Sequence, residues 1–316
     1  MNAPEISIVI PLYNEEKVFG MLVERLFKVR QSAGMNLEIV LVDDGSKDAT
    51  PLLIHQTAKE NPGVVGVILS RNHGHQLAVS AGLSVATGTN AVMILDGDLQ
   101  DPPELLTDFY SKLKEGYDVI YAVRQNRKES ALKRSAYWLY YRLQQRVSNI
   151  RIPLDSGDFS MLSRRVVDYM NMMPEQSRYL RGMRSWVGFR QFGFPYSRDG
   201  RAAGSSKYSW RKLFGLAFMG IFNFSDFPVR FISRLGIITI LVSLVYLVYV
   251  LISKFFFGNV PAGFTTLIIA FTLFSGVQLI SIGLIGQYVL RIYNQVRNRP
   301  LFIIDKIISS QKNTDG

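Results

Sequence analysis

The sequence predicts an α/β fold with a mainly parallel sheet, followed by helices that meet a membrane. Short apolar runs alternate with amphipathic segments through the first 123 residues, which is typical of strands joined by covering helices. Polar residues follow four of these runs in series, at the sheet edge where ligands bind in such folds. Two long apolar stretches come only after Arg234, and their length approaches the thickness of a bilayer.

The first half of the chain is expected to contain five strands and four helices. Each apolar run is short enough for a strand, and apolar residues at helical spacing follow it. Pro51 occupies a favoured first position of the second helix. Strands are expected at 6–12, 37–42, 64–69, 91–95 and 117–123, and helices at 19–27, from residue 50 onward, at 75–86 and at 104–115.

The residues that follow the strands have side chains suited to ligand binding. Asp43, just beyond the second strand, is expected to contact ligand, whereas the polar residues after it make a turn and cap the next helix. One pair of polar residues could belong to any loop, but four pairs in series indicate a binding edge. The pairs are Asn14 and Glu15, Asp43 and Asp44, Arg71 and Asn72, and Asp96 and Asp98.

The stretch I-L-D-G-D-L-Q-D-P-P, from Ile94 to Pro103, raises the question of a metal site. An apolar run stops at Asp96, and carboxylates then recur at alternate positions. Oxygen ligands of this kind suit Mg²⁺ or Mn²⁺, which commonly binds one or two carboxylates together with substrate phosphates. A polar loop ended by prolines is the alternative, and this short pattern alone does not decide between the two.

Composition excludes several classes of protein. The 316-residue chain contains no cysteine, which excludes disulfides, thiolate nucleophiles and cysteine-ligated metal centres. It lacks the glycine fingerprints of dinucleotide-binding folds and P-loop proteins. Its formal net charge is +11, which favours an anionic membrane surface or a nucleic acid as partner. Nucleic acid is disfavoured because no recognisable nucleic-acid-binding motif accompanies the charge.

The apolar stretches predict a hairpin of two transmembrane helices, at 235–257 and 265–290. Both outer ends carry arginines, whereas the connection carries almost no charge, so the positive-inside rule places the N-terminal part and the C-terminal tail in the cytoplasm. Residues 210–227 are expected to form an interfacial helix. Residues 135–146 form either a second interfacial helix or one that packs on the soluble domain.

The sequence therefore predicts four parts of the chain. We expect a cytoplasmic catalytic domain at 1–208, an interfacial juxtamembrane helix at 209–232, two transmembrane helices at 233–290 and a basic cytoplasmic tail at 291–316.

Seven motifs in order resemble the GT-A glycosyltransferases of family 2, and the membrane hairpin resembles their dolichol-phosphate mannose synthase-like group. The bacterial enzymes that load a sugar onto undecaprenyl phosphate, for O-antigen or lipid A modification, are the most similar. The resemblance runs from about Ile6 to Pro300. The motifs are I-V-I-P-L-Y-N-E-E, V-D-D-G-S-K-D-A-T, R-N-H-G, L-D-G-D-L-Q-D-P-P, G-D-F, S-S-K-Y and R-I-Y-N-Q-V-R-N-R-P.

The resemblance implies the GT-A nucleotide-sugar-binding fold, which is Rossmann-like, and roles for individual residues. It implies catalytic roles for Asp98, Asp158, Arg124 and Arg127. It implies a nucleotide-sugar site at Pro11, Tyr13, Glu15, Asp43, Asp96 and Lys207, Mg²⁺ or Mn²⁺ on Asp96, Asp98 and Gln100, and an acceptor-phosphate site at Arg201 and Ser206.

The implied reaction is inverting, metal-dependent transfer of a single sugar to a polyprenyl phosphate at the bacterial plasma membrane. A UDP-sugar is favoured over a GDP-sugar, and a homo-oligomer such as a tetramer is implied. Asp158 is expected to orient groups or hold a basic partner, although a role as base stays open because the acceptor could arrive protonated. The alternative is a non-catalytic, membrane-anchored protein that binds a nucleotide sugar or serves as a scaffold.

Two further stretches suggest chemistry but have simpler interpretations. His73 and His75 lack a third metal-ligating partner nearby, which favours hydrogen bonding within a loop. The stretch R-G-M-R-S-W, from Arg181 to Trp186, is similar to a motif of processive polysaccharide synthases. Its leading glutamine is absent, so we expect transfer of one sugar, with Trp186 packed in the domain.

Overall fold

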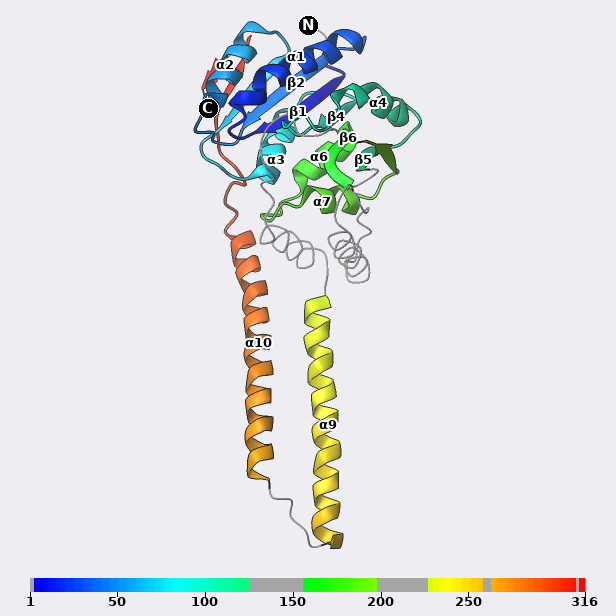
Figure 1. Ribbon diagram of the computed structural model, residues 1–316, viewed down its shortest axis with the longest axis vertical. Helices are drawn as coiled ribbons and strands as arrows, with labels where there is room; N and C mark the ends of the chain where they lie inside the picture. Colours follow the sequence, from blue (N-terminus) through cyan, green and yellow to red (C-terminus); the bar gives the residue numbers. More distant parts are fainter. Residues whose placement is uncertain (1–2, 125–155, 198–226, 258–262, 311–312, 316) are drawn as a thin grey trace.

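A computed structural model describes residues 3–124, 156–197, 227–257, 263–310 and 313–315. An α/β domain contains both ends of the described chain, and two long helices extend from one side of it (Figure 1). These are α9 (Phe227–Phe257) and α10 (Phe264–Val296). They run in opposite directions, and the chain passes down α9 and back up α10 to the domain (Figure 1).

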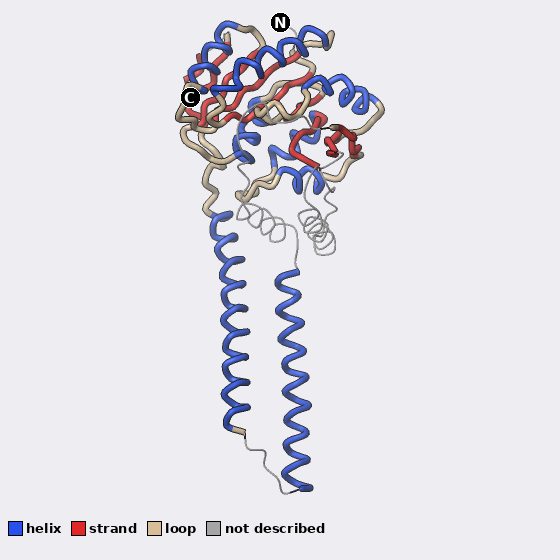
Figure 2. The backbone as a smooth tube through the Cα atoms, in the orientation of Figure 1, coloured by secondary structure: helices blue, strands red, loops and turns tan. Residues whose placement is uncertain are grey.

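The α/β domain is built on one nine-stranded sheet in the order β7-β5-β6-β4-β1-β2-β3-β8-β9, shown in red in Figure 2. Strands β4, β1, β2 and β3 are parallel, whereas β6 and β8 are antiparallel to their neighbours in this central group. The strands are β1 (Ile6–Leu12), β2 (Leu37–Asp43), β3 (Val64–Leu69), β4 (Ala91–Ile94), β5 (Val119–Arg124), β6 (Ser156–Ser163), β7 (Gln191–Tyr196), β8 (Ile304–Ser309) and β9 (Asn313–Asp315).

Helices cover both faces of the sheet because the central strands are apolar on both faces. In β1, Ile8 and Ile10 contribute to one hydrophobic cluster and Val9 to the other, as the alternation of side chains along a strand requires. Helices α1 (Glu16–Ser32), α2 (Thr50–Glu60) and α4 (Leu106–Lys114) pack on the first cluster. Helices α3 (His75–Val85), α6 (Arg164–Met172) and α7 (Leu180–Trp186) pack on the second.

The predicted α/β order of the first half is confirmed, with small shifts at element ends. The first and third predicted strands match β1 and β3. Asp43 was expected just beyond its strand, but it is the last residue of β2, because it continues the parallel pairing opposite Leu12. A short 3₁₀ turn, Pro103–Leu105, precedes α4. Strands β6 to β9 were not predicted.

Two long helices are present where the sequence predicts a transmembrane hairpin. Among the described residues, only Leu273–Val296 in α10 is long and apolar enough to cross a bilayer. The apolar segment of α9, Gly236–Val250, would extend about 22 Å, less than the roughly 30 Å of a hydrocarbon core. Membrane passage is therefore indicated by composition for one of the two predicted spans. The predicted interfacial segments, 135–146 and 209–232, lie outside the described residues, apart from 227–232, which form the start of α9.

Candidate active site

The site lies where the carboxyl ends of β1, β2 and β4 meet. Pro11 is buried within β1, and Tyr13 follows the strand with 37% of its surface exposed. Glu15 is the N-cap residue of α1, and its main-chain N–H donates to Thr50 Oγ1 at 3.0 Å. Asp43 ends the neighbouring strand. The chain thus brings four of the predicted nucleotide-sugar residues to one sheet edge, as expected for a parallel sheet.

Asp43 is held by main-chain donors of the turn that follows β2. Its carboxylate accepts hydrogen bonds from the N–H groups of Gly45 at 3.1 Å and Ser46 at 3.2 Å. Gly45 has a φ of +67°, and a Cβ there would lie 2.4 Å from the main-chain nitrogen of Asn72. Only glycine therefore allows this turn to approach the loop after β3 so closely. Burial raises the pKa of Asp43 despite these hydrogen bonds.

Asp44 has a structural role, but it binds the loop before α3 and not, as predicted, the turn and helix that directly follow it. Its Oδ1 accepts the main-chain N–H of His73 at 2.7 Å, and its carboxylate also accepts that of Gly74. Gly74 is the N-cap residue of α3. Asp44 therefore joins the turn after β2 to the start of α3, the helix that presents His75 and Gln76 to the site.

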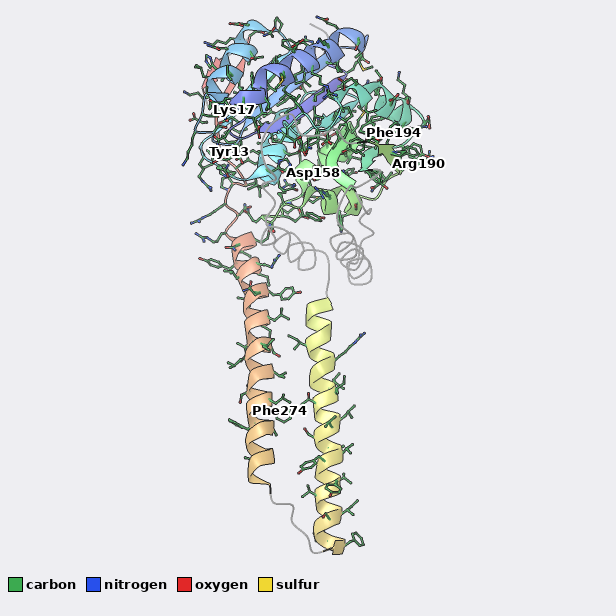
Figure 3. The ribbon with its side chains drawn as sticks, in the orientation of Figure 1. Tyr13, Lys17, Asp158, Arg190, Phe194 and Phe274 are labelled. Carbon is green, nitrogen blue, oxygen red and sulfur yellow. The ribbon has the colours of Figure 1, made fainter. Side chains whose placement is uncertain are left out.

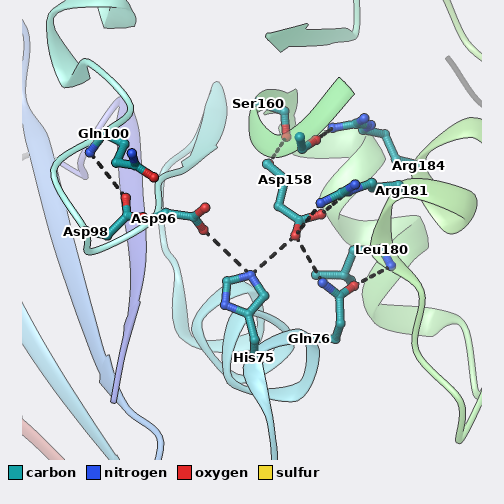
Figure 4. Close-up of polar contacts among 11 residues, drawn as sticks. His75, Gln76, Asp96, Asp98, Gln100, Asp158, Ser160, Leu180, Arg181 and Arg184 are labelled. Atoms are coloured by element: carbon teal, nitrogen blue, oxygen red, sulfur yellow. Dashed lines mark hydrogen bonds and ion pairs between the residues drawn. The ribbon is translucent and has the colours of Figure 1, made fainter. Parts of the chain in front are cut away.

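The loop after β4 carries the three residues predicted to hold a metal ion. Asp98 Oδ1 accepts the main-chain N–H of Gln100 at 3.2 Å (Figure 4). Leu99 between them has a φ of +59°, a conformation that is costly for a side chain of this kind. Arg25 on α1 donates to Leu99 O at 3.3 Å and also pairs with Glu104. Arg25 therefore connects this loop to α1.

The antiparallel strand β6 brings Asp158 to the same edge. Ile94 in β4 pairs with Ser160 in β6, and extending this register places Asp158 opposite Asp96. Asp158 lies in the lower half of the α/β domain, toward the long helices (Figure 3). Arg181 on α7 donates to its two oxygens at 2.8 and 3.3 Å, and Gln76 donates at 3.2 Å.

His75 lies between the two carboxylates (Figure 4). Its Nε2 is 3.7 Å from Asp96 Oδ1 and 3.4 Å from Asp158 Oδ2. Burial opposes protonation, but the hydrogen bond to Asp158 and the charges of both carboxylates raise the pKa of His75 to about 9. Burial disfavours ionisation of Asp158, yet the charge of Arg181 and the His75 hydrogen bond hold its pKa well below the usual range. At neutral pH, Asp158 is therefore a carboxylate held by two cations.

The chemistry of the loop after β4 fits a divalent cation. No group of three His, Asp or Glu side chains poised to hold a metal ion occurs among the described residues. Burial, followed by the negative charges of Asp101, Asp158 and Asp98, raises the pKa of Asp96 to about 6. A cation would offset this accumulation of negative charge, and its ligands would be oxygens, which Mg²⁺ and Mn²⁺ prefer.

Several predicted site residues cannot be placed from the described chain. Arg124 is the last residue of β5, opposite Tyr196, and its side chain lies outside the described part. Four further residues, predicted from the family resemblance to bind phosphates or act in catalysis, lie outside the described residues altogether. They are Arg127, Arg201, Ser206 and Lys207.

The sequence did not identify three residues that hold Asp158, namely His75, Gln76 and Arg181. The expectation of hydrogen bonding by a loop residue holds for His73, whose Nε2 accepts the main-chain N–H of Ile303. It is wrong for His75, which lies between two carboxylates. Arg181 belongs to the stretch R-G-M-R-S-W, so the signal was present, but its partner is 23 residues away on another element. Trp186 was expected to be packed in the domain, yet it is 62% exposed.

The sheet, the aspartate loop after β4 and the second carboxylate on β6 together define the GT-A class of glycosyltransferase. Residues 7–170 match the family described as Glycosyl transferase family 2. The chain belongs to this family.

Curated relatives are similar over nearly the whole chain. A bactoprenol glucosyl transferase of Shigella phage SfII is 37% identical, over 96% of this chain and 98% of its own. A prophage bactoprenol glucosyl transferase homolog of Escherichia coli is 35% identical, over 96% and 99%. An uncharacterized glycosyltransferase of Bacillus subtilis, YkcC, is 41% identical, over 96% and 94%. The predicted relationship to the bacterial polyprenyl-phosphate glycosyltransferases is therefore confirmed.

Proposed function

We propose that this protein transfers one sugar from a nucleotide sugar to a polyprenyl phosphate such as undecaprenyl phosphate. The observation that carries the proposal is the arrangement of Asp96, His75 and Asp158 at one sheet edge. In this arrangement the loop after β4, which is suited to a metal ion and a diphosphate, lies beside Asp158, whose carboxylate binds positively charged side chains. The relatives named bactoprenol glucosyl transferases support the polyprenyl acceptor.

The donor half of the site comprises the ends of β1 and β2 and the loop after β4. Pro11, Tyr13, Glu15 and Asp43 would line the base and ribose pocket of a nucleotide sugar, for which we propose a UDP-sugar. Asp96, Asp98 and Gln100 would hold Mg²⁺ or Mn²⁺. When bound, this ion stabilises the charge that develops on the nucleoside diphosphate as it departs.

The acceptor half of the site is organised by Asp158. A phosphate monoester is largely ionised at neutral pH, so its oxygen needs little help from a base. Asp158 keeps a low pKa because Arg181 and His75 surround it, which makes it a poor proton acceptor. We infer that Asp158 positions these two cations, and that the cations face the phosphates that meet at this edge.

The proposed reaction is a single displacement. An oxygen of the lipid phosphate attacks the anomeric carbon, a new carbon–oxygen bond forms, and the bond to the diphosphate breaks with its electron pair. One displacement inverts the anomeric configuration. Residues outside the described part would complete the phosphate contacts, among them by family position the basic Arg127, Arg201 and Lys207 and the hydroxyl residue Ser206.

We further propose that α9 and α10 both cross the bacterial plasma membrane, with the α/β domain and the C-terminus in the cytoplasm. The two helices lie side by side and return the chain to the same domain (Figure 1). The apolar segment Leu273–Val296 supports the second crossing. A homo-oligomer, such as a tetramer, is proposed from the family resemblance alone.

The test is transfer from a panel of radiolabelled UDP- and GDP-sugars to undecaprenyl phosphate in detergent, with Mg²⁺, Mn²⁺ or EDTA. We expect a metal-dependent lipid-linked product with inverted anomeric configuration, read by NMR. The variant Asp98→Ala should remain folded and lose about 100-fold or more of the rate, because it removes electrostatic stabilisation of the leaving group. Glu24→Ala, which alters an exposed ion pair on α1, is the matched control.

Two results would count against the proposal. Product formation that is unchanged by EDTA and by Asp98→Ala would remove the role assigned to the loop after β4. Nucleotide-sugar binding without transfer to any polyprenyl phosphate would instead support the alternative, a non-catalytic membrane-anchored protein that binds nucleotide sugars.

A further inference from the structure

After α10 the chain returns to the α/β domain and contacts the loop that leads to His75. Strand β8 pairs antiparallel with β3. Just before it, Ile303 accepts the main-chain N–H of Ser70 at 3.0 Å and donates its own N–H to His73 Nε2 at 3.4 Å. Phe302 packs against the hydrophobic cluster beneath α3, α6 and α7. The end of the long helix is thus fixed to the domain by main-chain pairing and by apolar contact.

A second connection joins the last turn of α10 directly to the loop between α6 and α7. Gln176 donates its main-chain N–H to Gln295 Oε1 at 3.0 Å, and Gln295 Nε2 donates to Pro174 O at 2.6 Å. Gln176 Nε2 also donates to Arg299 O, just beyond the helix, at 2.7 Å. We call these three hydrogen bonds the amide clamp. Gln295 lies in the last turn of the apolar segment Leu273–Val296, so the clamp marks one end of that segment.

Each connection lies within a few residues, along the chain, of side chains that contact Asp158. The loop fixed by Gln176 continues into α7, where Arg181 binds the Asp158 carboxylate. His73 is followed by His75 and Gln76, which contact the same carboxylate. Gln76 closes the arrangement, because its Oε1 accepts the main-chain N–H of Leu180 at 2.9 Å while its Nε2 binds Asp158. The end of α10 therefore supports both groups of residues that hold Asp158.

We propose that the amide clamp positions the acceptor half of the site relative to the membrane-spanning helix, with Gln176 and Gln295 as its positioning residues. The inference rests on the proposed function, in which the acceptor phosphate is confined to the bilayer surface. A rigid helix fixed to the loop before α7 sets how far Asp158 and Arg181 lie from that surface. A displacement of about 1 Å can cost up to about 100-fold in rate.

The test compares Gln295→Ala with Asn61→Ala in the full chain, reconstituted in lipid nanodiscs that contain undecaprenyl phosphate. Asn61 likewise donates a side-chain amide to a main-chain carbonyl, Thr57 O, but at the end of α2. We expect Gln295→Ala to lower kcat about tenfold with unchanged nucleotide-sugar affinity. We also expect faster amide hydrogen exchange in residues 176–183. Asn61→Ala should change none of these.

Conservative variants separate positioning from general destabilisation. Gln295→Glu keeps the acceptor for the Gln176 N–H but loses the donor to Pro174, so it should recover part of the rate. Gln176→Ala loses only the bond to Arg299 and should have the smaller defect. Wild-type kcat and unchanged exchange in Gln295→Ala would overturn the proposal. If the wild type transfers no sugar, the proposed function fails, and the exchange measurement still decides whether the clamp supports α7.

Discussion

Two aspartates at the same sheet edge, Asp43 and Asp158, are both buried but have opposite pKa shifts. Asp43 is 1% exposed and Asp158 is 9% exposed. Main-chain N–H groups of Gly45 and Ser46 hold Asp43, and burial raises its pKa. Asp158 is bound by the charged side chain of Arg181, and its pKa falls well below the usual range.

The difference shows that burial alone does not set the ionisation of a carboxyl group in this site. Neutral main-chain donors stabilise the carboxylate of Asp43 too weakly to offset its desolvation, whereas full positive charges do so for Asp158. The proposed donor half is therefore held by turn geometry, and the proposed acceptor half by charge. A substitution that distorts the turn should therefore weaken the donor half, and a substitution that removes a charge should weaken the acceptor half.

The largest effect is expected from Asp158→Asn, which removes the charge that holds the acceptor half. Breaking one side of a buried ion pair costs roughly 3–5 kcal/mol of stability, and the misplaced Arg181 should lower the transfer rate by about 100-fold. Denaturant unfolding and initial rates measure the two effects. The control Asp118→Asn breaks the ion pair with Arg165 and should lose stability without losing rate. A folded Asp158→Asn protein with wild-type turnover would contradict the prediction.

A smaller effect is expected from Gly45→Ala, which disturbs the turn geometry of the donor half. The left-handed φ of +67° and the contact with the main chain of Asn72 oppose any side chain, at a cost of about 1–3 kcal/mol. The Asp43 pocket should shift, so nucleotide-sugar affinity, measured by calorimetry, should fall more than kcat. Gly20→Ala, where a Cβ would meet nothing within 4 Å, is the control. Equal affinities in both variants would argue against this role for the turn.

The smallest effect is on the pH dependence of stability. It tests the acceptor half, because it depends on the charge of His75. Its pKa rises from 6.5 to about 9 on folding, so its contribution to stability is full below pH 6.5 and is lost as pH rises through about 9. The imidazole is 44% exposed, so we expect at most about 1 kcal/mol. Unfolding in EDTA at pH 6 to 10 measures it. His75→Gln should flatten this part of the profile; an unchanged slope would contradict the assignment.

Much of the donor half could be predicted from local patterns. The strands β1 to β4 and the polar residues after them follow from apolar runs and their abrupt ends, because a strand and the loop after it are contiguous in sequence. The prediction of a cation site in the loop from Asp96 to Asp101 has the same basis, and it stays a prediction. The position of Asp43 inside β2 was missed by one residue, since pairing with Leu12 decides it.

The acceptor half could not be predicted in this way. Asp158 meets Asp96 only because β6 runs antiparallel beside β4, and Arg181 reaches Asp158 from a separate helix. The return of residues 304–309 to the edge of β3 is also a pairing between segments far apart in the sequence. No local periodicity encodes such contacts, which depend on how the whole chain packs.

The sequence by itself determined the family, the α/β order and the residues suited to a cation and a diphosphate, because these depend on side-chain chemistry and local spacing. Only the tertiary structure decided the ionisation and the relative positions of the groups in the site. It placed His75 between two carboxylates, made Asp158 a carboxylate held by cations, and fixed the end of α10 to the loop before α7. Charge and position within a site depend on neighbours in space, and the fold alone brings these neighbours together.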